Sequence, residues 1–185
     1  MMNTKLTTAA LLAALLVAAP ARAQFGSLLN KVKEVHDDLT FTDAEEAQLG
    51  EAVSAKLREK YGVVQDKAVH KYVTLVGQLL AAESSRPNLP WTFVVLDTDG
   101  INAFAAPGGF VHITRGAMSI LKNEAELADI LAHEISHVTG KHAINAIKKA
   151  KIAGTATSAV PGDKAKQYAD SFYDVIIEGN YNRSD

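Results

Sequence analysis

The first strong run of apolar residues at helical spacing begins near Thr42 and predicts a helix that ends at Tyr61 and Gly62. Thr42 and Glu45 have the spacing of a capping box, in which each side chain bonds a backbone N–H of the other residue. A glycine directly after the last periodic residue is a common helix stop. The inner positions recur every four residues: Leu49, Val53 and Leu57. The pattern therefore predicts a helix that packs on a core through one face.

A second apolar period predicts a helix from about Lys67 to Ala82, and the expected role of its inner face is core packing. The prolines in residues 84–90 then indicate a turn. The inner positions of the helix are Val69, Tyr72, Val73, Val76 and either Leu79 or Leu80.

Two short apolar runs rich in β-branched and aromatic residues predict strands at 91–96 and 110–114. Residues 97–109, DTDGINAFAAPGG, are expected to form a loop between them. His112 is expected to be an exposed strand histidine and not a ligand, because no metal-ligand spacing ties it to another histidine. Alternation divides the second strand into two faces: Phe110, His112 and Thr114 on one, Val111 and Ile113 on the other.

A short helix is predicted over 117–122, and Asn123 then opens a longer one with Glu126 at the spacing of a capping box. This helix carries HEISH, from His133 to His137. Histidines four residues apart on a helix point within about 40° of each other. They lie beside the apolar stripe, so we expect both to be partly buried, where a metal would satisfy their nitrogens. The stripe consists of Leu127, Leu131, Ile135 and Val138.

The HExxH pattern is that of a zinc peptidase. His133 and His137 are the candidate Zn²⁺ ligands, Glu134 is the candidate general base on a zinc-bound water, and a third ligand comes from elsewhere. A merely structural pair of histidines is the alternative. His142, five residues past His137, is expected to turn away from the metal and to be a second-shell or structural histidine. Gly140 is expected to end or bend the helix, with further helices at 143–153 and 163–177 and a flexible linker at 154–162.

Composition narrows the chemistry of the 185-residue chain, which is long enough for one domain. It has no cysteine, which excludes disulfides, cysteine catalysis and thiolate zinc sites. Any metal must therefore bind His, Asp or Glu. The formal net charge is −2, which gives no indication of a basic nucleic-acid-binding surface.

Residues 1–23 have the pattern of a secretory signal peptide: Lys5, an apolar run from Ala9 to Ala19, and an A-x-A cleavage site that ends at Ala23. The mature domain would then be 24–185 and periplasmic. An uncleaved membrane anchor is the alternative. No second apolar run is long enough to span a bilayer, so no stable membrane span is expected after cleavage.

From about Thr42 to Asp185 the chain resembles the HtpX-like and BepA-like bacterial zinc metallopeptidases of peptidase family M48. The resemblance rests on Gly50 in the acidic first helix and on three segments: NAFAAPGGFVHITRGAM, EAELADILAHEISHVTGKH and the terminal GNYNRSD. It implies an α+β fold, a mostly helical zincin-type (gluzincin-like) domain with a small β-sheet beside the HExxH helix. It also implies that His133 and His137 bind zinc and that Glu134 is the base.

Two further expectations come from the resemblance. The strand at 110–114 looks like the edge strand that lines the cleft and pairs with an extended substrate. The third zinc ligand of the family is a Glu in a pattern like GYxRxxExxAD, and that Glu would fall just beyond Asp185. The chain is therefore expected to be a fragment or a truncated copy, with Glu178 and Asp185 as the nearby carboxylates that could substitute.

The resulting hypothesis is a zinc-dependent metalloendopeptidase that hydrolyses peptide bonds of periplasmic or envelope proteins. Its partners would be protein or peptide substrates and not nucleic acids; the sequence does not indicate an oligomeric state. The alternative is a catalytically incomplete binding module or chaperone that holds extended polypeptide through its edge strand. A secreted structural helical protein with a chance motif is a third interpretation, which the NAFAAPGG segment disfavours.

Overall fold

The computed structural model describes residues 26–27, 29–34, 40–153 and 164–177. The chain divides into two compact units, Met1–Thr40 and Phe41–Asp185. In the first unit, residues 26–27 and 29–34 are helical. The predicted signal peptide, the predicted linker and the carboxylates Glu178 and Asp185 lie outside the described residues.

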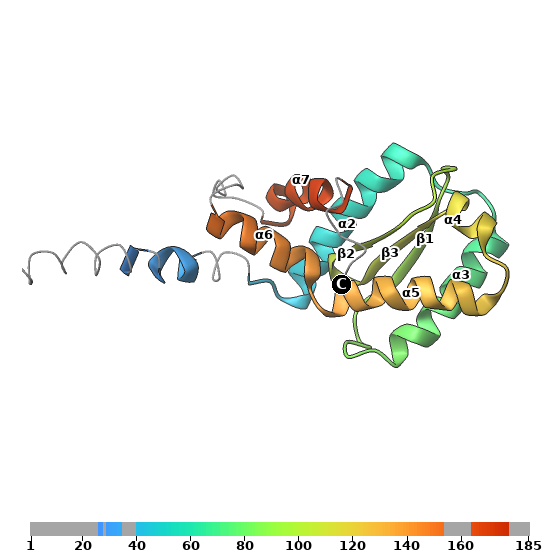
Figure 1. Ribbon diagram of the computed structural model, residues 1–185, viewed down its shortest axis with the longest axis horizontal. Helices are drawn as coiled ribbons and strands as arrows, with labels where there is room; N and C mark the ends of the chain where they lie inside the picture. The colour runs from blue at the N-terminus through green and yellow to red at the C-terminus, as the bar shows by residue number, and fades with distance from the viewer. Residues whose placement is uncertain (1–25, 28, 35–39, 154–163, 178–185) are drawn as a thin grey trace, which may run out of the picture. The chain divides into compact units, whose positions relative to one another are not determined.

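The second unit is mostly helical with one small mixed sheet, which confirms the predicted α+β class (Figure 1). Most of the predicted helices and strands are present with bounds within a few residues of the prediction. In chain order the elements are α2 (Asp43–Tyr61), α3 (Lys67–Ala82), β1 (Thr92–Leu96), β2 (Ala103–Ala106), the 3-10 helix η1 (Pro107–Gly109), β3 (Phe110–Thr114), α4 (Arg115–Ile120), α5 (Glu124–Thr139), α6 (His142–Ala153) and α7 (Lys164–Ile177).

The sheet has the strand order β1-β3-β2, with β1 parallel and β2 antiparallel to β3. Two expectations were wrong. The predicted loop at 97–109 contains a strand, β2, and the predicted edge strand β3 is the central one. The sequence AFAA of β2 is rich in alanine and shows no alternation, so its propensity is weak and its pairing with β3 makes it a strand.

Helices cover both faces of the sheet (Figure 1). On one face α3 and α5 pack over Val111 and Ile113 of β3. On the other face α2 buries its apolar side, and α7 packs on α2. This three-layer arrangement holds α5, the helix with the HEISH motif, against the sheet. The buried cluster between the sheet and α3 and α5 includes Val73, Ala81, Phe93, Val95, Leu127, Leu131, Ile135 and Val138.

Helix caps follow the sequence closely. The Thr42 hydroxyl accepts from the Glu45 N–H at 3.2 Å, and the Glu45 carboxylate accepts from the Thr42 N–H at 2.8 Å, a complete capping box. At the start of α5 the Asn123 side chain accepts from the Glu126 N–H at 3.0 Å. The Glu126 carboxylate instead accepts the N–H of Lys122 at 2.8 Å. The prediction of Asn123 as the N-cap is confirmed. The return bond of a capping box would go to the N–H of Asn123, but it goes to the N–H of the preceding residue, Lys122.

The face of α3 differs in part from its prediction. Val69, Val76 and Leu80 pack against the core, whereas Leu79 is 71% exposed and Tyr72 40% exposed. Leu80 is thus the inner one of the two leucines, because α3 contacts β1 and α5 through the face that carries Val73 and Ala81.

His112 was predicted to be exposed, and this is wrong: it is fully buried. The cause is the central place of β3, whose His112 face is covered by α2. Ser54 on α2 lies 2.8 Å from His112, Oγ to Nε2. Burial lowers the pKa of His112 to about 4. Its Nδ1 has no hydrogen-bond partner among the described residues.

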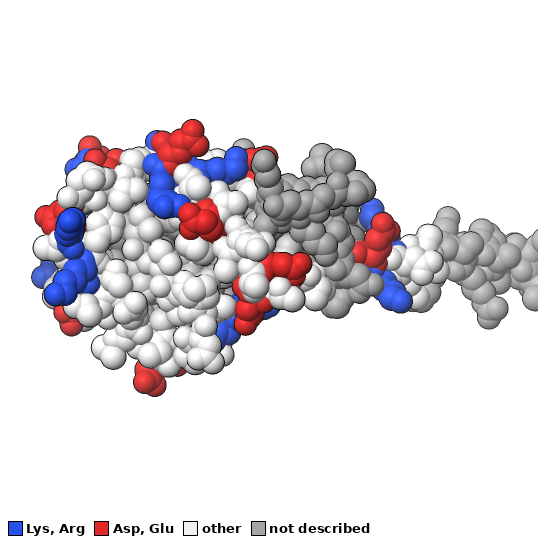
Figure 2. Space-filling view, turned by 180° about the vertical axis from the view of Figure 1, so that it is seen from behind, with Lys and Arg blue, Asp and Glu red and all other residues white. Residues whose placement is uncertain are grey.

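The surface seen in Figure 2 carries acidic and basic side chains in mixed groups, with uncharged side chains over much of the area between them. Within the described ranges, no helix is both long enough and apolar enough to span a membrane.

Candidate metal centre

The orientation of α5 is set by its apolar stripe. Leu131 is fully buried, and Leu127, Ile135 and Val138 are nearly so. These positions recur at three- and four-residue spacing, so one side of the helix is fixed in the core. The remaining sides of the last turns carry His133 and His137.

The two histidines come together as predicted. The Nε2 atoms of His133 and His137 lie 3.0 Å apart, and their ring centroids are separated by 4.6 Å. Their burial differs from the prediction: His137 is half-buried, but His133 is exposed. The expectation of partial burial was therefore wrong for His133, because the apolar stripe points into the core and leaves this histidine outside it.

The spacing of the two nitrogens fits a zinc ion. Two nitrogens bound to a tetrahedral zinc at about 2.0–2.1 Å are separated by about 3.3 Å. The observed 3.0 Å is close to this value and would need only a small movement of the side chains. Imidazole nitrogen is also a ligand type that zinc prefers.

A third ligand is not found where the structure describes the chain: no group of three His, Asp or Glu side chains there could hold a metal. His112 is buried against Ser54 and is not a ligand candidate, which agrees with that part of the prediction. Glu178 and Asp185, the carboxylates that the sequence put forward, fall outside the described residues.

Glu134 follows His133 on α5 and is only 9% exposed. Burial raises the pKa of Glu134 to about 7, because the charged carboxylate loses hydration. A carboxyl group with a pKa near neutrality can both accept and release a proton at physiological pH. Glu134 is thus a candidate for acid–base chemistry beside the two histidines.

His142 was predicted to be a second-shell or structural histidine. The structure places its Nδ1 2.6 Å from the Nδ1 of His137, on the ring edge opposite the nitrogen that faces His133. Its contact is thus with a candidate ligand. The sequence did not show this contact, because it depends on the conformation of Lys141, which has a φ of 53°.

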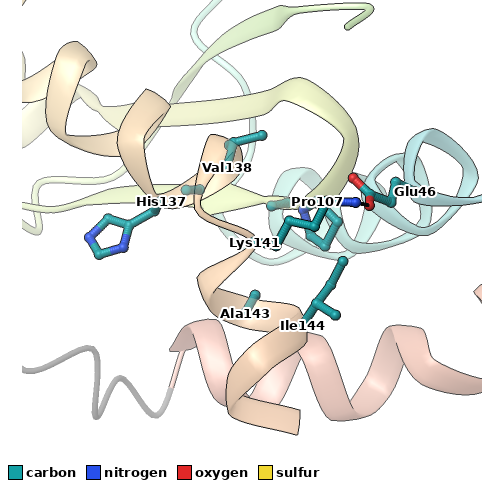
Figure 3. A pocket seen from close by; sticks show the side chains of 9 residues that line it. Glu46, Pro107, His137, Val138, Lys141, Ala143 and Ile144 are labelled. Atoms are coloured by element: carbon teal, nitrogen blue, oxygen red, sulfur yellow. Dashed lines mark hydrogen bonds and ion pairs between the residues drawn. The ribbon is translucent and has the colours of Figure 1, made fainter. Parts of the chain in front are cut away.

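Sequence reasoning also missed Glu46. It is 1% exposed, and its carboxylate forms ion pairs with Arg86 at 2.8 Å and with Lys141. Figure 3 shows Lys141 reaching from the end of α5 to Glu46 on α2. These two residues line a small pocket, partly open to solvent, together with His137, residues 105–107 and Val138, Ala143 and Ile144. Glu46 is one of three acidic residues in the first turn of α2, with Asp43 and Glu45, and nothing in the local sequence distinguishes it from them.

Comparison with known proteins shows the family of the chain. The model of peptidase family M48 matches residues 67–177, which is more than half of the chain. This chain belongs to peptidase family M48. The matched segment includes the whole HEISH motif, the sheet and α3 to α7.

Several M48 relatives carry names that describe a protease. The chain is 36% identical over 103 residues to a putative β-barrel assembly-enhancing protease of Vibrio cholerae, covering 56% of this chain and 21% of that protein. It is 32% identical over 109 residues to the β-barrel assembly-enhancing protease of Escherichia coli K12, covering 59% and 22%. A mitochondrial metalloendopeptidase OMA1 of Schizosaccharomyces pombe is 36% identical over 76 residues, covering 41% and 23%. The chain thus spans about a fifth of the length of these relatives.

Proposed function

We propose that this chain is a zinc-dependent metalloendopeptidase with Glu134 as its general base. The observation that carries the proposal is the pair of imidazole Nε2 atoms 3.0 Å apart, with a buried carboxyl group on the same helix. Membership of a metallopeptidase family supports it. His133 and His137 would hold the metal, and the third ligand is to be sought outside the described residues, Glu178 first.

Zinc, when bound, supplies Lewis-acid chemistry that polarises a peptide carbonyl and makes water more acidic. The chain's own contribution is proton transfer. A carboxylate oxygen of Glu134 accepts the proton of the attacking water and then delivers it to the nitrogen of the departing amine. The pKa of about 7 suits both steps, since neither protonation state of Glu134 is strongly disfavoured near neutral pH.

The corrected sheet order supports the outer edge of β2 as the proposed place of the substrate. β2 and not β3 lies at the edge of the sheet next to α5. Ala105 and Ala106 of β2 line the same pocket as His137. An extended polypeptide that paired with the outer edge of β2 would lie beside the two histidines, and main-chain pairing of this kind accepts many sequences.

The proposed substrates are proteins of the bacterial envelope. This rests on residues 1–23, which have the pattern of a signal peptide and would direct a mature domain of 24–185 to the periplasm. It also rests on relatives whose names refer to β-barrel assembly. We propose accordingly that the chain acts on unfolded or unassembled envelope proteins.

The test is hydrolysis of an unfolded protein substrate by the wild-type chain and by Glu134→Gln, with zinc content measured in each. We expect the variant to keep its zinc and to lose about 10²–10⁴-fold in rate, the usual contribution of a general base. Asp129→Asn, an exposed carboxylate on the same helix, is the matched control and should cleave normally. Undiminished cleavage by Glu134→Gln would end the proposal.

A binding module remains the second candidate, because no three-ligand group exists within the described ranges. Such a protein would bind unfolded polypeptide without cleaving it, and a chelator would not change this binding. Chelator-sensitive cleavage by the wild-type chain separates the two, since only the peptidase requires the metal.

A further inference from the structure

We propose that the turn between α5 and α6 is a positioning device for the ligand His137, in which Glu46 holds Lys141 and the turn sets His142 against His137. The inference rests on the proposed metal site and deepens it. Three separate observations support it: the contact between the two histidines, the room left by Gly140, and the buried carboxylate that anchors the turn.

The contact between His137 and His142 determines the tautomer that metal binding needs. The Nε2 of His137 faces His133 and must be free of a proton to bind a metal. In the metal-binding tautomer the proton of His137 would reside on Nδ1 and would be donated to the Nδ1 of His142, which lies 2.6 Å away. A hydrogen bond at the far nitrogen fixes both the tautomer and the plane of a metal-binding imidazole. His142 therefore acts on the metal through His137.

Gly140 leaves the space in which the His142 ring lies. A Cβ atom at position 140 would be 2.5 Å from the Nε2 of His142 and 2.8 Å from its Cδ2. Gly140 itself has a φ of −76°, which any residue adopts, so what a side chain at this position would disturb is the present place of the His142 ring. The turn is thus shaped around the imidazole.

Lys141 reverses the chain between the two helices and is held from the other side of the sheet. Its φ of 53° is unusual for a residue with a side chain, and such conformations persist where surrounding contacts impose them. The backbone of Lys141 is held locally, since its N–H donates to the carbonyl of Val138 at 3.1 Å and its carbonyl accepts the N–H of Asn145 at 2.9 Å. Its side chain adds an ion pair with the carboxylate of Glu46, on α2. Arg86 pairs with the same carboxylate at 2.8 Å, so the buried charge is compensated by two cations.

The geometry also indicates how Glu46 can influence His137. In Figure 3 the side chain of Lys141 extends toward Glu46, whereas the ring of His137 points away from both. Glu46 therefore reaches the candidate ligand through the backbone of the turn and through His142. If the ion pair only stabilised the fold, its loss would lower stability and leave the metal affinity and the tautomer of His137 unchanged.

The first measurement is the affinity of the purified chain for Zn²⁺, from competition with a chromophoric chelator, in wild type, His142→Ala, Lys141→Met and the double variant. Loss of a group that orients a metal ligand commonly weakens binding about 10–100-fold. We expect a loss of this order for His142→Ala and a smaller one for Lys141→Met. The double variant should bind no more weakly than His142→Ala alone, because the two residues act along one path.

Control variants show whether a change in zinc affinity is specific to His142 and Lys141. Lys149→Met removes an exposed lysine of α6 and should leave the affinity unchanged. His142→Asn offers a side-chain oxygen close to the position of Nδ1 and should recover most of the lost affinity. Thermal unfolding of each variant shows whether it is folded, and Lys141→Met retains the ion pair of Glu46 with Arg86.

The second measurement needs no metal: the ¹⁵N chemical shifts of the His137 ring, which report its tautomer. In metal-free wild type and in Lys149→Met we expect a single tautomer of His137, with the proton on Nδ1. In His142→Ala and in Lys141→Met we expect a mixture of the two tautomers of His137. Unchanged shifts and unchanged affinity in the folded variants, or additive losses in the double variant, would overturn the inference. A wild-type chain that binds no Zn²⁺ but has the expected shifts would refute the proposed function and leave the role of His142 in place.

Discussion

The burial of His112 predicts that the stability of the protein depends on pH in a defined direction. The pKa of this histidine is about 4 in the folded chain, against an ordinary value of 6.5, and the first cause is burial. The unfolded chain therefore binds a proton between pH 6.5 and pH 4 that the folded chain does not. The stability due to neutral His112 is complete above pH 6.5 and is lost as the pH falls toward 4.

The magnitude follows from the two pKa values. Their difference corresponds to about 3 kcal/mol in total, of which about 2 kcal/mol is lost between pH 8 and pH 5. Glu134 acts in the opposite sense, because burial raises its pKa to about 7, and its contribution weakens stability as the pH rises from 4.5 through 7. A single stability curve therefore mixes both effects, and the effect of His112 must be isolated by a variant.

The assay is urea unfolding of wild type and His112→Gln at pH 8 and pH 5. Glutamine can still reach the Ser54 hydroxyl but does not titrate, so the variant should lose stability at pH 8 and regain about 2 kcal/mol relative to wild type at pH 5. Ser54→Ala is the control: it removes the partner at 2.8 Å but keeps the histidine, and its difference from wild type should change little between the two pH values. A difference between wild type and His112→Gln that stayed constant with pH would refute the reasoning.

Two further predictions concern the scaffold of the site. Gly50→Ala would place a Cβ 2.0 Å from the backbone oxygen of Pro107, so we expect the free energy of unfolding to fall by about 1–3 kcal/mol. In the control Gly100→Ala the added Cβ meets only an ordinary contact at 3.7 Å, so this variant should be as stable as wild type. Thermal unfolding measures both variants, and equal melting temperatures would contradict the close approach at Gly50. Leu131→Ala removes a fully buried side chain under the HEISH helix and should cost about 2–5 kcal/mol in urea unfolding, while Leu79→Ala, 71% exposed, should cost little; similar losses would mean that the stripe does not hold α5 in the core.

Local patterns were sufficient for the elements that a periodic run and a cap define. The capping box at Thr42 and the N-cap at Asn123 were read directly, because both motifs lie within four residues. The spacing of His133 and His137 likewise fixed their meeting, since four residues make about one turn of a helix. The same is true of the alternating faces of 110–114, since Val111 and Ile113 pack in the cluster with α3 and α5, whereas His112 lies against Ser54 of α2.

Strand β2 could not be predicted from local sequence patterns. Its four residues carry little propensity, and its extended form depends on η1, where Gly108 has a φ of 71° and returns the chain to β3. With β2 in that position, β3 is the central strand of the sheet. The edge at which a substrate could pair is therefore formed by β2 and not by β3. Strand order depends on pairing between segments, and a single strand's composition does not contain it.

The amino-acid sequence by itself determined the HEISH helix, the identity of the candidate ligands and base, and the family to which the chain belongs. Only the tertiary structure decided that His112 is buried, that Glu46 is an anchor, and that His142 meets His137. The physical reason is that burial, charge pairing and the αL turn at Lys141 depend on which helix covers which face of the sheet. The contact between Lys141 and Glu46 joins residues 95 positions apart, beyond the reach of any local period.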